Sequence, residues 1–401
     1  MGIEKLMSLL TPSMAARLGA GMGWVTGRLS SGRRKVVERN LRIAFGREKS
    51  ADELKKLTDE VFIRNGANLI ASLCTAGMSE KRLASVVRIE NPELRGELGA
   101  SGKGVVVLLA HMGNWEVLAQ AFTKLIPPGS RAGTIYRLLN NPHMDAHMKT
   151  VRRRSGLELF EKRSNPLAMA AFMRSGGSLG ILSDQRAEAA GEIVPFFGRM
   201  TSCTPLPAIL SRRLGVPVVG ISMRTVAPGR WVMKLHRLQA ESTTQNCMRL
   251  LEEMIRESPA DVFWLQDRWR TNRKAPLHLM GRPPTAEARI ACTQVRRVLV
   301  WLGDADLPVK PDTSGDDLSW ECSLPGSRSL PLPAWLPAGV RRYPRASTMP
   351  TRDELMEELQ RIDQTEIAPL DVVVATAGQR VVAKACRRLG LALVESVQHS
   401  G

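Results

Sequence analysis

The hydrophobic pattern is clearest in the stretch VVVLLAHMGNWEVLAQAF, which covers residues 105–122. Its first six residues, Val105–Ala110, form an apolar run of strand length without alternation, which is typical of a strand buried on both faces in a parallel sheet. An apolar face at helical spacing follows Asn114, a residue type favoured as a helix N-cap. The stretch therefore predicts a buried strand, a turn that carries His111, and a helix.

Similar apolar runs and amphipathic segments alternate along most of the chain, which favours an α/β fold. We predict a mixed, mostly parallel sheet with helices on both faces. A Thr351/Glu354 capping box opens one helix, and the proline- and serine-rich residues 308–350 are expected to be irregular. The other predicted strands are 87–94, 133–136, 178–183, 216–223, 298–302, 371–375 and 391–394, and the other predicted helices are 206–214, 244–257, 351–362 and 379–389.

A chain of 401 residues exceeds the size of a single core, which rarely grows past about 250 to 300 residues. Apolar residues recur at helical spacing within residues 1–30. We expect a helix that lies in the membrane interface or, alternatively, one that packs on the main domain. Residues 31–274 are predicted to form the main domain and residues 275–294 a linker. Residues 295–401 are predicted to form a small C-terminal α/β domain of unknown role, so that a chain ending near Pro283 should fold.

The formal net charge of +18 indicates an acidic partner, such as nucleic acid, anionic lipid or an acidic protein. No nucleic-acid motif is present, and aromatic residues at 4% offer few stacking platforms, so we expect no nucleic-acid partner. The six cysteines form no C-x-x-C pair, which argues against a disulfide framework and favours a reduced compartment.

His111 and Glu116 are the first candidates for chemistry, because the end of a buried parallel strand is where open α/β sheets bind ligands. If the turn folds His111 back over the start of the helix, the Glu116 carboxylate can accept from one imidazole nitrogen. The other nitrogen is then free to act as a base toward a hydroxyl group. A capped helix with a buried, hydrogen-bonded histidine is the alternative interpretation.

The motif HMGNWE at residues 111–116 resembles the H-x4-E motif of the bacterial lipid A (lauroyl/myristoyl) acyltransferase family, a branch of the glycerolipid-acyltransferase superfamily. Several ordered motifs are more specific than one, and the resemblance extends over roughly residues 30–274. One departure is Gln266, which stands about where the family usually has a histidine. The other segments in the family's order are RNLRIAFG (39–46), TIYRLLNNP (134–142), GILSDQR (180–186), VPFFGRMTSCTP (194–205), LGVPVVGI (214–221) and DVFWLQDRWR (261–270).

The resemblance implies that His111 is the general base, that Glu116 orients it, and that Arg137 meets an oxyanion or a substrate phosphate. Asp184 is expected to bind substrate or orient a neighbour, with turn capping as the alternative. Phe196 and Phe197 are expected to line an acyl groove or to lie in the core. The expected substrate-binding residues are Asn114, Arg137, Arg152, Arg153, Asp184 and Gln185.

The function implied is transfer of a fatty acyl group from acyl carrier protein to a hydroxyl of a lipid A precursor or related membrane lipid. No metal or redox cofactor is implied, and the partners are acyl carrier protein, the acceptor lipid and an anionic membrane surface at the cytoplasmic face of the inner membrane. Three alternatives stay open: a glycerolipid or mannoside acceptor, a metallohydrolase built from His111, His143 and His147, and a non-enzymatic anionic-lipid-binding protein.

Overall fold

The structure is a computed structural model and describes most of the chain, with gaps. Its contacts divide the chain into two compact units, which we treat separately, and the domain limits expected from the sequence stay predictions. Unit 1 comprises Met1–Glu38, Ala51–Ala187 and Cys203–Arg268, and unit 2 comprises Arg39–Ser50, Glu188–Ser202 and Trp269–Gly401. The described residues are 10–76, 78–99, 103–136, 145–146, 149–150, 152–153, 155–161, 166–272, 274–303, 308–313, 317–325, 332–345, 350–376 and 378–396.

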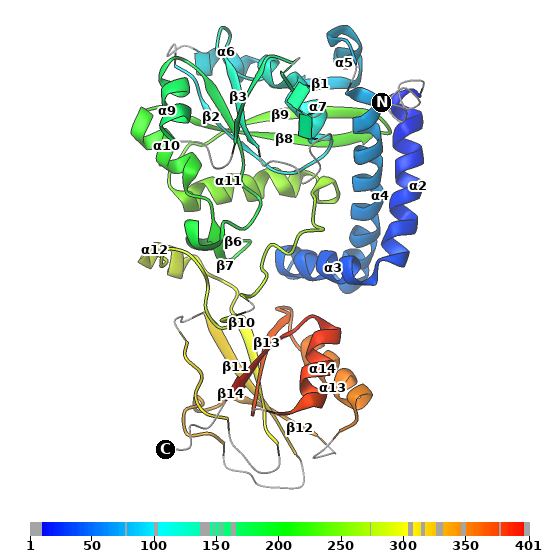
Figure 1. Ribbon diagram of the computed structural model, residues 1–401, viewed down its shortest axis with the longest axis vertical. Coiled ribbons are helices and arrows are strands. Elements are labelled where there is room, and N and C mark those ends of the chain that lie inside the picture. Colours follow the sequence, from blue (N-terminus) through cyan, green and yellow to red (C-terminus); the bar gives the residue numbers. More distant parts are fainter. Residues whose placement is uncertain are drawn as a thin grey trace. The chain divides into compact units, whose positions relative to one another are not determined.

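A seven-stranded sheet in the order β1-β9-β8-β2-β5-β3-β4 forms the centre of unit 1 (Figure 1). Among the strand pairs of this sheet that the structure describes, only β8 and β9 are antiparallel, which confirms the predicted mixed, mostly parallel arrangement. All four residues of β2 are buried, as their unbroken apolar run predicts. The strands are β1 (Val87–Glu90), β2 (Val106–Leu109), β3 (Ala132–Tyr136), β4 (Leu157–Glu161), β5 (Ser178–Leu182), β8 (Val218–Ala227) and β9 (Arg230–Arg237).

Helices cover both faces of this sheet. Val107 and Leu109 of β2 pack in one core cluster with Leu118 of the helix that follows. On the other face, Gly220 of β8 lies so close to Met254 of α11 that a Cβ atom would be 2.4 Å from its sulfur, and Figure 1 shows α11 crossing beneath the strands. The helices of this unit are α2 (Pro12–Leu29), α4 (Ala51–Thr75), α5 (Glu80–Val86), α6 (Glu93–Gly99), α7 (Trp115–Ala121), α9 (Pro166–Arg174), α10 (Leu206–Leu214) and α11 (Thr244–Glu257).

The first described helix is α2, which begins after Thr11. The Thr11 hydroxyl accepts a hydrogen bond from the Met14 amide at 3.2 Å, and Pro12 occupies the first turn, so the helix has a well-formed N-terminus. The predicted apolar positions before Leu10 lie outside the described residues. Among the helices that the structure describes, none has the length and apolar composition to cross a membrane.

Unit 2 contains a five-stranded parallel sheet in the order β12-β11-β10-β13-β14 and a separate hairpin of β6 and β7. The predicted capping box of Thr351 and Glu354 is present at the start of α13. The predicted β-α-β unit is confirmed as β13, α14 and β14. The elements are β6 (Glu192–Phe196), β7 (Arg199–Cys203), α12 (Ala286–Ile290), β10 (Arg296–Trp301), β11 (Leu318–Pro325), β12 (Arg341–Arg345), α13 (Arg352–Gln364), β13 (Leu370–Thr376), α14 (Arg380–Leu389) and β14 (Ala392–Ser396), and α3 (Ser31–Phe45) contributes residues to both units.

The prediction that residues 308–350 are irregular is wrong, because they include β11 and β12. The hydrophobic pattern does not predict β11, because polar residues occupy buried positions in this strand. Glu321 accepts a hydrogen bond from Arg297 at 2.7 Å, and Ser323 accepts one from Arg345 at 3.2 Å. These side-chain partners come from other strands, so the local hydrophobic pattern does not reveal that such polar groups are compensated.

A buried ionic cluster joins three distant segments of unit 2. The Asp371 carboxylate on β13 forms ion pairs with Arg39 of α3 and Arg199 of β7, and both Asp371 and Arg199 are almost fully buried. Burial opposes ionisation of Asp371, but the two guanidinium groups outweigh it and lower its pKa to about 2. The cluster therefore ties residues 39–50 and 188–202 to the C-terminal sheet through paired charges.

Candidate active site

The candidate site lies at the carboxyl ends of β2 and β5, which are neighbouring parallel strands. Their register pairs Leu109 with Leu182 at the end of the ladder. His111 and Asp184 each lie two residues farther along, so the same register brings them opposite each other. Because side chains alternate along a strand, they also fall on the same face as the two leucines.

The imidazole of His111 contacts the carboxylate of Asp184 directly. Its Nδ1 atom lies 2.9 Å from Oδ1 and 3.2 Å from Oδ2. Burial disfavours the imidazolium, but the charge and hydrogen bond of Asp184 outweigh it and raise the pKa of His111. Burial likewise opposes ionisation of Asp184, while the histidine holds the pKa of this carboxyl group below its usual range. A neutral His111 therefore donates through Nδ1 and leaves Nε2 as the basic nitrogen.

The turn that carries His111 is fixed by its backbone. Gly113 has a positive φ of 59°, and a Cβ atom there would lie 2.7 Å from the Met223 carbonyl oxygen, so only glycine fits without rearrangement. The Gly113 amide donates to the Asp261 carbonyl at 2.9 Å, and the Phe263 amide donates to the His111 carbonyl at 2.8 Å. These contacts hold the histidine at the strand end.

The structure places Glu116 differently from the expectation. In the first turn of α7, its carboxylate accepts two hydrogen bonds from Arg152, at 2.7 and 3.2 Å, whereas the carboxylate that contacts the His111 ring nitrogen is that of Asp184. The reason is that His111 lies before the turn at Gly113 and continues the line of β2 beside β5, whereas Glu116 lies after the turn, on α7. Glu116 and Asp184 thus have separate partners at one site.

Asn114 begins α7, as predicted. Its side-chain oxygen accepts from the Val117 amide at 3.2 Å, which satisfies one of the free donors at the helix start. The same hydrogen bond fixes the plane of the amide group. Its Nδ2 atom is buried and has no hydrogen-bond acceptor within the described residues. An unsatisfied buried donor beside a catalytic candidate calls for a partner that the described residues do not supply.

Two further side chains surround the imidazole. The Gln185 side-chain nitrogen lies 3.4 Å from both ring nitrogens of His111, close enough to contact a group bound there. The Trp115 indole meets the imidazole edge-on, with ring centroids 5.6 Å apart. The ring is therefore held between a polar and an aromatic neighbour, and its side chain keeps 19% of its surface exposed.

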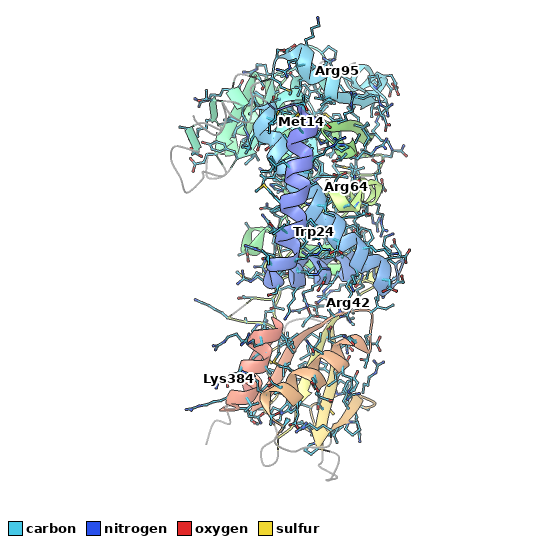
Figure 2. The ribbon with its side chains drawn as sticks, turned by 90° about the vertical axis from the view of Figure 1, so that its right-hand side faces the viewer. Met14, Trp24, Arg42, Arg64, Arg95 and Lys384 are labelled. Atoms are coloured by element: carbon cyan, nitrogen blue, oxygen red, sulfur yellow. The ribbon has the colours of Figure 1, made fainter. Side chains whose placement is uncertain are left out.

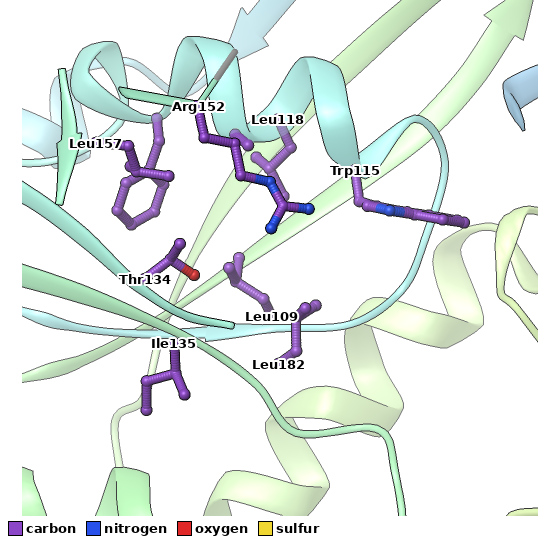
Figure 3. A pocket seen from close by; sticks show the side chains of 10 residues that line it. Leu109, Trp115, Leu118, Thr134, Ile135, Arg152, Leu157 and Leu182 are labelled. Carbon is purple, nitrogen blue, oxygen red and sulfur yellow. The ribbon is translucent and has the colours of Figure 1, made fainter. Parts of the chain in front are cut away.

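An apolar pocket adjoins this pair, because Trp115, which contacts the imidazole, also lines the pocket. Figure 3 shows the Arg152 guanidinium directed into the space between α7 and the strands that carry Leu109 and Leu182. Thr134 and Arg152 are its polar lining residues, so the pocket suits a hydrocarbon group with one polar end. The apolar lining residues are Leu109, Trp115, Leu118, Ala119, Phe122, Ile135, Leu157 and Leu182.

Several expected site residues either lie outside the described residues or have other surroundings. Arg137, His143 and His147 lie outside the described residues, so the oxyanion contact and the alternative metal site stay predictions. Arg153 is described and exposed. Phe196 and Phe197 belong to unit 2 and are buried core residues whose rings contact each other, with centroids 4.9 Å apart. Of the two alternatives for this pair, an acyl groove or the core, the structure therefore favours the core.

The pocket is the part of the site that sequence reasoning missed. The hydrophobic pattern identifies Leu118 and Phe122 only as part of the apolar face of a helix, and it does not predict β4, to which Leu157 belongs. The register of β2 against β5 is also a long-range property that no local pattern contains. Once that register is known, the two-residue offsets of His111 and Asp184 from their strands identify the pair.

Comparison with known proteins defines the family. Residues 1–271 match the family model described as bacterial lipid A biosynthesis acyltransferase. No curated protein matches the chain. Among solved structures, the crystal structure of translation initiation factor eIF-2B from Pyrococcus horikoshii OT3 is 14% identical, covers 54% of this chain and 75% of its own, and has a TM-score of 0.19, so it carries no argument. The family model spans well over half of the sequence, and the chain belongs to the bacterial lipid A biosynthesis acyltransferase family.

Proposed function

We propose that this protein transfers a fatty acyl group from the thioester of acyl carrier protein to a hydroxyl group of a lipid A precursor. The observation that carries the proposal is the His111–Asp184 pair, which adjoins a pocket with an apolar lining. The pair supplies a base, and the pocket has the lining that a hydrocarbon chain requires. Family membership supports acyl transfer to a lipid as the overall reaction.

In the proposed reaction, Nε2 of His111 removes the proton of the acceptor hydroxyl while its oxygen attacks the thioester carbonyl. A carbon–oxygen bond forms, and a tetrahedral oxyanion develops on the carbonyl oxygen. Collapse of this intermediate breaks the carbon–sulfur bond, and the proton held by His111 passes to the departing thiolate. Asp184 keeps the proton-accepting nitrogen free and stabilises the imidazolium that forms between the two steps.

The oxyanion and the substrate phosphate need donors. We assign the buried Nδ2 of Asn114 and the side-chain amide of Gln185 to the acyl carbonyl. The Asn114 Nδ2 has no acceptor among the residues that the structure describes, and the Gln185 amide lies beside the imidazole. Arg152 is assigned to a phosphate or carbonyl group bound at the pocket that it lines, where Glu116 holds its guanidinium in place. Arg137 is retained as a further donor on the grounds of the family resemblance.

The acyl chain would lie among Leu109, Leu118 and Phe122, and its thioester would then lie near His111. We assign the docking of acyl carrier protein to the basic surface that includes the exposed Arg153, since this donor is acidic and the chain carries a net charge of +18. Exposed charges act mainly on the association rate, so salt should weaken this contact.

The test is reconstitution with pure protein, an acyl carrier protein thioester and a lipid A precursor in detergent, followed by mass spectrometry of the lipid. The expected product gains one acyl chain, and His111→Ala should lower the rate by about a hundredfold to ten-thousandfold. Unchanged turnover in His111→Ala protein would contradict the assigned base. Acylation of a glycerolipid or a mannoside with the lipid A precursor left unmodified would contradict the assigned acceptor.

A further inference from the structure

Asp261 is a buried carboxylate that the proposed reaction does not use. It ends the single helical turn that follows α11, and it is 0% exposed. Its Oδ1 atom accepts from the Thr225 hydroxyl at 2.6 Å and from the Asn68 side-chain amide at 3.2 Å. Its Oδ2 atom accepts from the Thr225 amide at 2.8 Å and the Ser258 hydroxyl at 2.7 Å, and Arg64 lies 3.4 Å away. Both oxygens are therefore engaged within the protein, which offsets the cost of burying the charge.

The backbone of the same segment pairs with the turn that carries His111. The Asp261 carbonyl accepts from the Gly113 amide at 2.9 Å, and the Phe263 amide donates to the His111 carbonyl at 2.8 Å. The residues between these two contacts form an antiparallel bridge. The turn is thus held by a three-residue ladder, and Asp261 stands at one end of it.

Polar side chains of α4 hold this ladder from the other side. Arg64, labelled on α4 in Figure 2, donates to the Thr225 carbonyl at 2.9 Å. Asn65 donates to the Val262 carbonyl at 3.0 Å, one position beyond the Asp261 carboxylate that Asn68 contacts. Asn65 and Asn68 are buried, and their spacing of three places them on one side of the helix. Buried amides are costly unless they find partners, and here the segment that holds the turn supplies those partners.

We infer that Asp261 is a positioning residue, which sets the place of His111 by anchoring residues 261–263 to α4 and β8. The carboxylate is fully buried and its oxygens are engaged, so it acts through the backbone of the turn and not on the substrate. The hydrogen bond of 2.9 Å between His111 and Asp184 depends on this placement. A displacement of about 1 Å can lower a catalysed rate by about a hundredfold. The effect on the rate rests on the proposed function, whereas the effect on the geometry of His111 does not.

Asp261→Asn tests the anchor at almost constant shape. One oxygen becomes an NH2 group, and either orientation of the new amide sets this donor against an N–H donor, that of the Thr225 backbone or that of the Asn68 side chain. Asn68 cannot turn its oxygen toward the new amide without losing the hydrogen bond that this oxygen accepts from the Trp231 indole at 2.8 Å. The segment must therefore shift, and the turn that carries His111 shifts with it.

The first measurement is the NMR titration of the His111 imidazole in the full chain, whose signal is the one of six that is absent from His111→Ala protein. The charged groups that act on this imidazole are Asp184, Glu116 and Arg152, and Asp261→Asn alters none of them. A looser contact with Asp184 should move the titration to lower pH. For acyl transfer, kcat should fall by about tenfold to a hundredfold while KM changes little, and the acidic limb of kcat/KM should move with the titration.

The double variant Asp261→Asn/Asn68→Asp exchanges the donor and the acceptor at this contact, so it should restore the titration and kcat toward their wild-type values. The matched control is Glu257→Gln, because Glu257 also accepts a hydrogen bond from β8, at 2.9 Å. It should lower the free energy of unfolding without moving the titration of His111. If Asp261→Asn does not fold, Thr225→Val replaces it, since this change removes one donor to the carboxylate and should move the titration in the same direction.

A titration of His111 and a kcat equal to those of the wild type in folded Asp261→Asn protein would overturn the inference. So would a loss of activity in proportion to the unfolded fraction with an unchanged titration, because Asp261 would then only stabilise the fold. An increase in KM at constant kcat would place Asp261 in substrate binding instead. A wild-type protein that transfers no acyl group would contradict the proposed function alone, because the NMR titration does not depend on turnover.

Discussion

His111 and Asp184, separated by 73 positions in the chain, form one hydrogen-bonded pair because each residue lies two positions beyond a paired end of two parallel strands. The pair therefore depends on the strand register, since a shift of one residue would turn one of the side chains to the opposite face. The Glu116 carboxylate of the H-x4-E motif instead accepts a hydrogen bond from Arg152. The two acidic residues are expected to affect different steps of catalysis.

Asp184→Asn should lower both the rate and the pH at which activity appears. Asp184 raises the pKa of His111, and a base must be neutral to act, so wild-type activity should rise with pH through a value above the ordinary histidine pKa. Removing the charge leaves burial, which lowers the pKa, so the acidic limb of kcat/KM should move to lower pH. The maximal rate should fall by about a hundredfold or more, because the imidazolium loses its partner. A limb that does not move would contradict this assignment.

Glu116→Gln should weaken substrate binding more than it slows the chemical step. The change removes the charge that holds Arg152 at the pocket, so KM should rise by about tenfold. The acidic limb of the pH profile should move to lower pH by less than in Asp184→Asn, because Glu116 contributes less than Asp184 to the raised pKa of His111. Glu158→Gln is the control, because Glu158 forms a comparable but exposed ion pair with Arg131. A large fall in kcat with unchanged KM would assign Glu116 to the base.

Substitutions of Asn114 can separate its role as a helix cap from its proposed role as an oxyanion donor. Asn114→Asp and Asn114→Ser keep an oxygen that can cap α7 but remove the Nδ2 donor, whereas Asn114→Ala removes both. We expect kcat to fall by about a hundredfold in all three variants, as for a lost oxyanion donor. Asn114→Ala should also lose about 1 kcal/mol of folding free energy in urea unfolding. Full activity in Asn114→Ser would limit Asn114 to the cap.

Ala119→Leu should change the preference for acyl chain length. Ala119 lines the pocket, and a larger side chain there would fill part of its volume. The ratio of kcat/KM for a long thioester to that for a short one should fall by about tenfold, the typical effect of a small change in an apolar pocket. The matched control is Ala171→Leu on α9, which lies outside the pocket lining. An equal loss for all chain lengths would indicate that the acyl group binds elsewhere.

Asp371→Asn should destabilise unit 2 by about 3 to 5 kcal/mol in urea unfolding, because Arg199 would remain buried without its carboxylate partner. The pKa of Asp371 is lowered to about 2, so its contribution to stability is present above its unfolded pKa of about 4 and is lost as the pH falls through about 2. Glu366→Gln breaks an exposed ion pair with Arg341 and should cost about 1 kcal/mol or less.

The sequence predicted most of the local structure and part of the site. The apolar run of β2, the Asn114 cap and the capping box at Thr351 depend on neighbouring residues, so they can be recognised without tertiary information. His111 was located because a strand and a helix meet there. β11 was missed because its inward Glu321 relies on Arg297, and the partner of Glu116 was missed because Arg152 lies 36 positions away. Such pairings arise from tertiary structure.

The ionic cluster at Asp371 also bears on when the chain can fold. Asp371 is 332 positions from Arg39, and ribosomes release the chain from its N-terminus, so Arg39 and Arg199 emerge long before their shared carboxylate. Contacts of such sequence separation are slow to form because a long loop must close first. Unit 2 therefore cannot complete its charge pairing during synthesis until β13 has left the ribosome.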